Sequence, residues 1–167
     1  MRNMGITIGP VDWWVATPDG IDSMAISCPL GTILPDKSAV ICRAGGVAWI
    51  VAPATTQVIE SWAGGQYNTT LVGDKCCVSE WSSLCSALVS AGFNPGDWFV
   101  PCYQLLQNPG YVCRTNWDSF STTCYWSSTE FSATNAYGLS YFSGGGACSN
   151  LTKASTRCVR AFRCVTY

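Results

Sequence analysis

The sequence contains no histidine and few charged residues, and both absences narrow its range of functions. Without histidine, neither a Ser–His nor a Cys–His catalytic pair can form, so the common nucleophilic hydrolase mechanisms are excluded. Charged residues make up 11% of the chain, whereas about a quarter is usual for soluble domains. This composition predicts a surface rich in uncharged Ser, Thr, Asn and Gly, or a surface buried in an assembly. The nine basic residues form no cluster, so nucleic-acid binding is not expected.

Long apolar segments are also absent. The chain has no uninterrupted run of about 18 apolar residues, so we expect no transmembrane helix and no membrane insertion. The N-terminus, MRNMGITIGPVDWW, lacks the apolar core and the small-residue cleavage site of a signal peptide. Synthesis in a cytoplasm combined with an uncharged outer surface predicts a virion component released by lysis. The alternative location is extracellular or on a cell surface.

Cysteine, in contrast, is abundant. The chain has eleven cysteines, an odd number, so at least one is unpaired or pairs outside the chain. Cys76 and Cys77 are adjacent, no C-x-x-C occurs, and the spacing fits no zinc site. The cysteines form either a disulfide framework or small apolar core residues, and the sequence leaves both readings open. No metal or other cofactor is expected.

The middle of the chain predicts a hairpin followed by two helices. Strands over residues 38–43 and 46–52 flank the turn Ala44-Gly45-Gly46, and the second strand is apolar on both faces, so it should be central. A helix over residues 78–91 is predicted from an apolar stripe that ends before Gly92. The stripe comprises Trp81, Leu84, Cys85, Leu88 and Val89. A shorter helix should begin at Pro101 and stop before Pro109.

The last third of the chain predicts a β-meander. The strand-like segments cover residues 123–127, 136–142 and 156–165, with Gly144, Gly145 and Gly146 between the last two. The whole pattern predicts an α+β fold in which two helices pack on short antiparallel sheets.

Two short motifs in this region resemble a known family. The sequence WSSTE (126–130) is followed about ten residues later by an aromatic strand, and VRAFR (159–163) lies near the C-terminus. This order resembles the C-type-lectin-like domains of bacterial surface adhesins, including a collagen-like adhesin, and of phage tail and capsid structural proteins. Residues 98–106 and 46–53 resemble the family's second helix and its N-terminal strand. The resemblance covers residues 38–165 and implies a C-type-lectin-like, non-enzymatic module.

Residues 1–30 lie outside the resemblance and are predicted to form an extended arm, leaving one domain over residues 31–167. Trp13 and Trp14 occupy a short apolar run between Pro10 and Pro18. Adjacent residues of an extended segment point to opposite faces. The arm therefore either packs on its own domain or, as we predict, contacts other copies of the chain or another virion protein.

A ligand-binding surface is predicted from aromatic and amide residues in or beside the C-terminal loops. Aromatic rings stack on sugars, amides hydrogen-bond hydroxyl groups, and both residue types serve adaptable protein-binding surfaces. Trp126 is expected in the core and Glu130 at a surface or turn. The candidate ligand-binding residues are Asn116, Trp117, Tyr125, Asn135, Tyr137 and Asn150.

The leading prediction is a virion structural or adhesive module: a phage fibre, tail or capsid-decorating subunit that binds other virion proteins or itself, and a host-surface glycan or protein. The alternative is a bacterial surface adhesin domain that binds glycans. A third reading is a copper-dependent oxidase resembling formylglycine-generating enzymes. It requires Cys158 and Cys164 to face the same side of one regular strand and bind copper(I).

Overall fold

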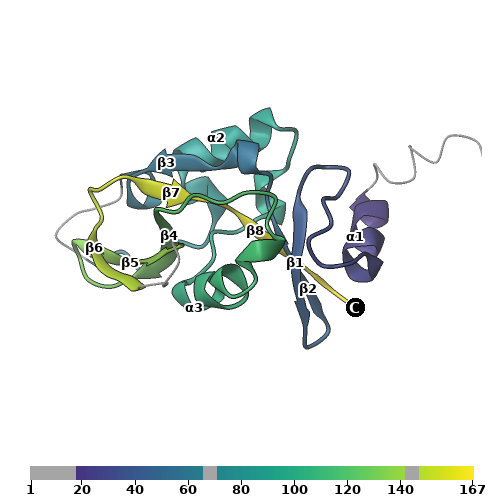
Figure 1. Cartoon of the computed structure of the whole chain (residues 1–167). Helices are drawn as coiled ribbons and strands as arrows, with labels where there is room; N and C mark the ends of the chain where they lie inside the picture. The colour runs from purple at the N-terminus through teal and green to yellow at the C-terminus, as the bar shows by residue number, and fades with distance from the viewer. Residues whose placement is uncertain (1–17, 66–70, 142–146) are drawn as a thin grey trace, which may run out of the picture.

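The structure, a computed structural model, describes residues 18–65, 71–141 and 147–167. Its framework is two β-sheets that share no strand (Figure 1). The antiparallel three-stranded sheet has the order β1 (Ala39–Ala44), β2 (Val47–Val51) and β8 (Phe162–Thr166). The mixed five-stranded sheet has the order β3 (Val58–Glu60), β7 (Arg157–Val159), β4 (Cys124–Glu130), β5 (Asn135–Ser140) and β6 (Ala147–Thr152).

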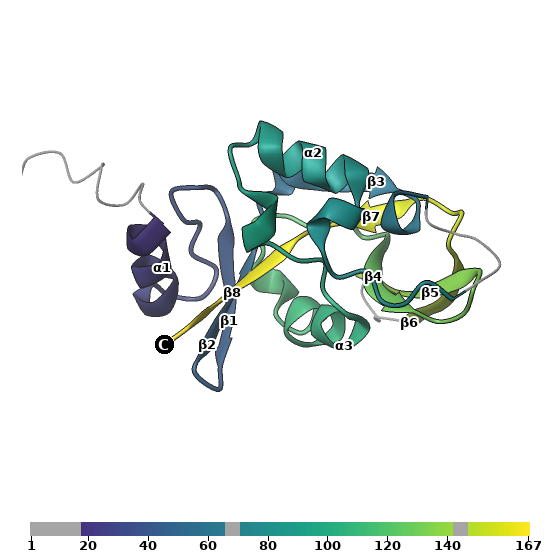
Figure 2. The ribbon, with the colours of Figure 1, turned by 180° about the vertical axis from the view of Figure 1, so that it is seen from behind.

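In the described segments, three α-helices surround the sheets and confirm the α+β class. They are α1 (Pro18–Ser27), α2 (Ser82–Ser90) and α3 (Tyr103–Leu105). A helical segment, Leu106–Tyr111, follows α3 and is interrupted at Asn108 (φ −142°, ψ 115°). Seen from both sides, α2 lies above β3 and β7 and α3 lies below, while α1 lies at the end of the domain opposite β5 and β6 (Figures 1 and 2). Short 3₁₀ turns cover Ala54–Thr56, Trp62–Gly65, Val78–Glu80, Pro95–Asp97 and Arg114–Asn116.

The N-terminal hairpin is confirmed. Gly45 and Gly46 have φ of 60° and 76°, a left-handed conformation that glycine adopts without a steric penalty. The turn pairs β1 with β2, and β2 is the central strand, as its apolar sequence predicts. Ile50 and Val51, on its opposite faces, are both fully buried.

The main helix, predicted over residues 78–91, is confirmed over Ser82–Ser90, but Val78–Glu80 forms a separate 3₁₀ turn. Trp81, Leu84 and Leu88 are fully buried, but Val89, which was predicted in the same stripe, is 58% exposed. It follows Leu88 directly and therefore points about 100° further around the helix. The Glu60 carboxylate, from β3, accepts hydrogen bonds from the backbone N–H groups of Ser83 (3.3 Å) and Leu84 (3.2 Å). A negative charge at a helix N-terminus is favourable, since it meets the positive end of the helix dipole.

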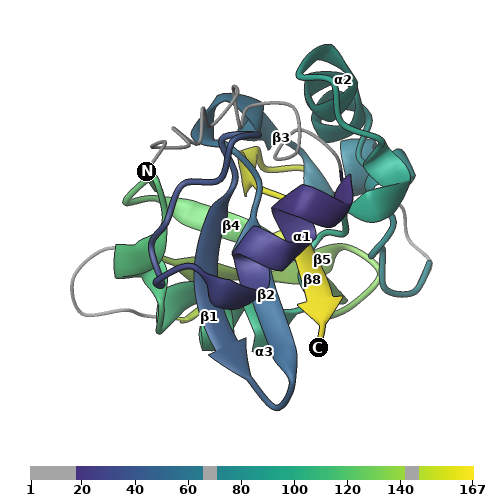
Figure 3. The ribbon, with the colours of Figure 1, turned by 90° about the vertical axis from the view of Figure 1, so that its right-hand side faces the viewer.

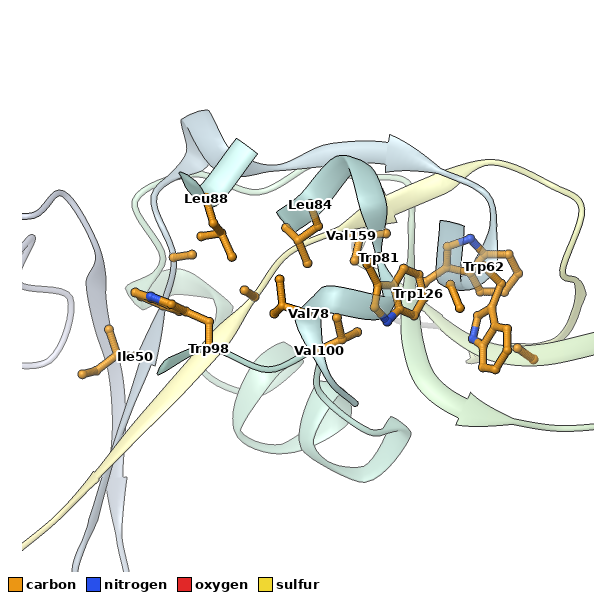
Figure 4. Packing of buried hydrophobic residues seen from close by; sticks show 14 of the residues in the cluster. Ile50, Trp62, Val78, Trp81, Leu84, Leu88, Trp98, Val100, Trp126 and Val159 are labelled. Atoms are coloured by element: carbon orange, nitrogen blue, oxygen red, sulfur yellow. The ribbon is translucent and has the colours of Figure 1, made fainter. Parts of the chain in front are cut away.

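Tryptophan side chains form much of the core beneath α2. Trp62 and Trp81 meet edge to face with ring centroids 6.0 Å apart, and Trp126 lies beside them (Figure 4). Trp98 packs at the other end of this cluster, towards Ile50. Trp126 is 1% exposed, so its assignment to the core is confirmed.

The second helix ends where predicted, before Pro109. Asn108 is extended (φ −142°, ψ 115°), so the helix that contains α3 is broken there and a separate turn carries Pro109 and Gly110. Gly110 is required there: a Cβ at this position would lie 2.7 Å from the Tyr141 Oη and 3.1 Å from the Leu105 carbonyl oxygen. The close approach to Tyr141, which is distant in sequence, could not be read from local propensity.

The predicted C-terminal meander is correct in type but wrong in its third strand. β4, β5 and β6 form the meander, and β6 was not anticipated. Residues 156–165 do not form one long strand. They divide into β7, which pairs with β3 and β4, and β8, which pairs with β2 in the other sheet.

The buried side chain of Arg160 holds the crossing between the two sheets. Its Nε donates to the Ala52 carbonyl (2.8 Å), and its other nitrogens donate to the Ser119 carbonyl and the Asp118 carboxylate. The second Asp118 oxygen accepts from the Ala54 N–H at 2.8 Å. Arg160 thus links the end of β2 to the segment preceding β4.

The N-terminal region differs from the prediction. Residues 18–27 form α1 instead of an extended arm, and Figure 3 shows α1 lying against β2 and β8. Ala25 is fully buried, and Ile21 and Met24 pack against the core. The extended arm predicted for residues 1–30 is therefore wrong from residue 18 onward. Trp13 and Trp14 lie outside the described residues.

We predict that Arg160→Gln destabilises the domain by about 3–5 kcal/mol, because it removes one partner of a buried ion pair. Chemical denaturation would measure the change. Arg157→Gln is the matched control and should cost under about 0.5 kcal/mol, since within the described residues the Arg157 guanidinium hydrogen-bonds the adjacent Thr156 carbonyl (2.7 Å) and no other group. Equal losses for the two variants would contradict the role assigned to Arg160.

Candidate functional site

Three aromatic side chains from separate elements meet at the surface. Tyr137 of β5 packs against Tyr103 of α3, with centroids 5.0 Å apart, and against Phe131, which follows β4, at 5.2 Å. Phe131 is 47% exposed, and the two tyrosines are half-buried. Together with Asn135 and Asn150, these residues are called the Tyr137 surface below.

The alternation of β5 explains why part of this surface was predictable. Asn135 and Tyr137 lie on one face of the strand, whereas Ala136 between them points into the core and is fully buried. β6 lies next to this end of β5, with Asn135 opposite Thr152. This pairing brings Asn150 close to Asn135.

Asn135 and Asn150 form an amide pair. The Asn135 Nδ2 donates to the Asn150 side-chain oxygen (2.6 Å) and to its backbone carbonyl (3.2 Å). Asn150 has a φ of 67°, a left-handed conformation that asparagine adopts more readily than most residues. The Asn135 backbone N–H is held by the Ser132 hydroxyl at 3.1 Å. The pair is thus fixed from both strands.

Tyr103 and Phe131 were missed at the sequence level. The Tyr103 N–H donates to the Thr129 hydroxyl at 3.0 Å, so a residue of the WSSTE segment sets the start of α3. Gln107, one turn later, donates to the Tyr103 hydroxyl at 3.2 Å. Phe131 immediately follows WSSTE, and a polar turn beginning with an aromatic residue was the available signal for it.

A buried ion pair underlies the surface. The Lys153 side chain is 0% exposed and donates to the Glu130 carboxylate, whose side chain is 6% exposed. The Lys153 amine also donates to the Ala133 carbonyl (3.1 Å) and lies 4.5 Å from the Trp62 ring centroid. Glu130, expected at a surface or turn, is the last residue of β4 and stands directly before a turn, but its side chain is buried in this ion pair. It anchors the turn that carries Phe131.

The charge of Glu130 is stabilised by its surroundings. Burial alone would raise the pKa of the carboxyl group, but hydrogen bonds from Lys153 and from the backbone N–H groups of Val72 and Gly73 lower it below its ordinary value of 4.5. The Gly73 bond is 2.8 Å long. A carboxylate with this many donors is a structural anion and a poor general acid.

Trp117 and Tyr125, both predicted to contact ligand, belong to the core. They are 7% and 1% exposed and pack with Tyr141 and Phe162 in an aromatic cluster. Burial raises the pKa of Tyr125 to about 12. Its hydroxyl donates to the Gln57 side chain at 2.5 Å. Neither ring is available to a surface ligand, so both leave the candidate site.

Asn116 also has a structural contact. Its Nδ2 donates to the Ile41 carbonyl in β1 at 2.8 Å, which joins the segment before β4 to the hairpin. Of the six predicted ligand-binding residues, the structure thus brings together Asn135, Tyr137 and Asn150. Asn116, Trp117 and Tyr125 were chosen because aromatic and amide residues look alike in sequence whether they bind ligand or brace the fold.

The hypothesis of a copper-dependent oxidase required two cysteines on the same face of one strand. Cys158 is buried on β7 and Cys164 is exposed on β8, so they belong to different sheets. The premise of one regular strand is therefore wrong. In residues 18–65, 71–141 and 147–167, no group of three or more His, Cys, Asp or Glu side chains is placed to hold a metal ion.

Comparison with known proteins does not assign the chain to a family. No protein-family model matches the sequence, and no curated protein is significantly similar to it. Among the helices of the described segments, none is both long and apolar enough to span a membrane.

We predict that Glu130→Gln lowers the stability near neutral pH by about 3–5 kcal/mol, because Lys153 is left buried without its counter-charge. The folded pKa of Glu130 is depressed, so its contribution is complete above the ordinary value of 4.5 and is lost as pH falls below it. The difference in unfolding free energy between the wild-type protein and Glu130→Gln should therefore become smaller at acidic pH. Denaturant titrations across this pH range would measure it.

The matched control is Glu80→Gln. Glu80 pairs with Lys75 at 3.2 Å, but the two side chains are 28% and 16% exposed. Its loss should cost at most about 1 kcal/mol. A Glu130→Gln variant no less stable than this control, or with an unchanged gap in acid, would contradict the buried-pair assignment.

Proposed function

We propose that the protein is a non-enzymatic, C-type-lectin-like virion module, a fibre, tail or capsid-decorating subunit of a phage, and that the Tyr137 surface binds a host-surface glycan. The observation that carries this proposal is the exposed, uncharged cluster of three aromatic rings and two amides on a braced scaffold. Such a cluster suits a neutral ligand that offers both apolar faces and hydroxyl groups.

The roles of the two motif segments support a non-enzymatic module. Glu130, in WSSTE, pairs with a buried lysine, and Arg160, in VRAFR, holds the crossing between the sheets. In both segments the Glu130 carboxylate and the Arg160 guanidinium are therefore occupied by contacts within the domain. Motifs of this kind specify a fold and leave chemistry to other surfaces.

The chemistry of the Tyr137 surface favours a sugar over a charged ligand. None of its five residues carries a charge, so long-range attraction contributes little. Aromatic faces pack against the C–H groups of a pyranose ring. Asparagine side chains can donate to and accept from hydroxyl groups, and the Asn135 amide is already bonded to Asn150 and Thr134, which fixes its orientation. The five rings and amides project from β5, β6, α3 and the turn after β4.

The arrangement of the domain supports attachment at one end and binding at the other. Residues 1–17 join the domain at the start of α1, which lies at the end opposite β5 and β6 (Figures 1 and 2). An anchor that includes Trp13 and Trp14 would therefore leave the Tyr137 surface facing away from the particle. The same surface would serve the alternative, a bacterial adhesin, and incorporation into particles distinguishes the two.

We predict that Phe131→Ala and Tyr137→Ala each weaken binding to the responsive glycan about two- to tenfold, since an aromatic contact contributes about 0.5–1.5 kcal/mol. A glycan array followed by titration calorimetry would identify the ligand and measure the loss. Tyr167→Ala is the matched control: Tyr167 is 59% exposed at the other sheet. Unchanged binding in both surface variants, or equal loss in the control, would reject the assigned surface.

We further predict that deleting residues 2–17 leaves a folded domain that no longer enters particles. Burial of the two indoles would contribute a few kcal/mol to the contact. The deletion must stop before α1, because Ala25 is fully buried, and removing residues 2–30 should unfold the domain. Thermal melting and particle incorporation would be measured together. A truncated chain that incorporates normally would show that the anchor lies elsewhere.

A further inference from the structure

A surface cavity is lined by residues from α1, from β8 and from the segment that follows α2. Its volume is about 380 Å³, which is within the usual range for cavities that bind small molecules. Figure 3 shows α1 packed beside β8 at this end of the domain. None of the lining side chains belongs to the Tyr137 surface, so the cavity is a separate candidate site. The lining includes Ile21, Asp36, residues 91–94, Asp97, Trp98 and Arg163.

Arg163, the second arginine of the VRAFR motif, is incompletely bonded. Its side chain is 16% exposed, and its Nη1 lies 2.8 Å from the Asp22 carboxylate. The Nε and Nη2 atoms are buried and, within the described residues, have no hydrogen-bond partner. Unpaired buried N–H groups are rare in native proteins, because each has lost its bonds to water. Since Arg163 lines the cavity, a molecule bound there can supply the missing acceptor.

Aromatic rings hold Arg163 and form the apolar wall of the cavity. The guanidinium carbon of Arg163 lies 5.6 Å from the centroid of the Trp98 ring, and Trp98 is 5% exposed. Phe93 meets the Trp98 ring edge to face, with centroids 5.2 Å apart. Phe93 and Ile21 are half-buried and line the same space. The cation is therefore seated beside a surface that suits an aliphatic or aromatic group.

Two carboxylates line the cavity without a basic partner. One oxygen of Asp36 accepts hydrogen bonds from the Ser38 N–H (3.0 Å) and hydroxyl (2.6 Å). Asp97 is exposed and accepts from the Asn94 amide at 3.3 Å. Among the described residues, neither carboxylate forms an ion pair. The end of α2 adds the negative pole of a helix dipole, so this part of the cavity favours a positive charge.

We propose that this cavity binds a small zwitterion with an apolar body, the chemical class of a free aliphatic or aromatic amino acid. The forked guanidinium of Arg163 matches the ligand carboxylate. The ligand ammonium group lies by Asp36 and Asp97, and its side chain packs against Phe93 and Trp98. Arg163 turns its guanidinium towards the cavity to make this contact, because Nε and Nη2 are shielded in the structure. This site goes beyond glycan recognition and does not depend on it.

The charges of the lining disfavour simpler ligands. A plain carboxylic acid would bond Arg163, but it would bring another negative group towards Asp36 and Asp97, and like charges repel each other. A plain amine would be attracted by the two carboxylates, but it would leave the Arg163 N–H groups unbonded. A zwitterion meets both requirements, so the ligand needs both of its charged groups.

The test measures the binding of leucine and of phenylalanine to the purified full chain by titration calorimetry at neutral pH. Each amino acid is compared with the acid that lacks its amino group, isocaproic or hydrocinnamic acid. Each is also compared with the amine that lacks its carboxylate, isopentylamine or phenethylamine.

We expect at least one of the two amino acids to bind. Its amine should bind at least about tenfold more weakly, since hydrogen bonds to a charged group are lost. Its acid should bind about two- to fivefold more weakly, a smaller loss because Asp97 is exposed to solvent. Absence of binding by both amino acids, or an acid or amine that binds as tightly as its amino acid, would overturn the proposal.

Two variants assign the charged groups of the ligand to their partners. Asp97→Asn should weaken binding of the amino acid, but it should not weaken binding of the matching acid, which has no ammonium group. Arg163→Lys should weaken binding of the amino acid and leave binding of the matching amine unchanged. Glu80→Gln is the control, because Glu80 lies outside the cavity, and it should bind every probe as the wild-type chain does.

A loss of equal size for the amino acid and the matching acid in Asp97→Asn would reject the assigned ammonium contact. Equal losses for the amino acid and the matching amine in Arg163→Lys would likewise reject the carboxylate contact. Where Arg163→Lys fails to fold, the comparison of the three probes on the wild-type chain and on Asp97→Asn still decides the question.

Discussion

The buried guanidinium of Arg160 is the constraint on which the two-sheet arrangement depends. A cation withdrawn from water must be paired and fully hydrogen-bonded, or it costs several kcal/mol. Arg160 meets this demand only where Ala52, Asp118 and Ser119 converge. Because these acceptors come from the end of β2 and the segment before β4, satisfying one side chain fixes how the three-stranded sheet meets the five-stranded one.

Buried charged side chains with partners inside the domain also occur elsewhere in the chain. Glu130 and Lys153 form a second buried pair, and the Glu60 carboxylate meets the N-terminus of α2. A chain with only 11% charged residues thus places several of them inside. Each links segments that are distant in sequence, so these charges specify tertiary structure. The exposed Tyr137 surface is left to neutral aromatic and amide groups.

The elements that could be predicted from the sequence are those determined by residues close together in the chain. The glycine turn gave the first hairpin, and the stripe through Trp81 and Leu88 gave α2. The break at Arg160, the strand β6 and the close approach of Gly110 to Tyr141 depend on partners far along the chain, so no local pattern could show them. In the candidate site, β-strand alternation placed Asn135 and Tyr137 correctly. Trp117 and Tyr125 have the same residue chemistry, but long-range packing buries them.

The composition of the Tyr137 surface also bears on how such a module would act. Its rings come from α3, β5 and the turn after β4, and the Thr129–Tyr103 and Glu130–Lys153 contacts hold them in place. Binding therefore needs little reordering of the surface. Yet a small uncharged contact gives modest affinity for a single sugar. Many copies on one particle would raise the effective concentration of the surface and convert weak contacts into firm attachment. In the proposed function, assembly through the N-terminal end and recognition through the opposite end would thus be coupled requirements.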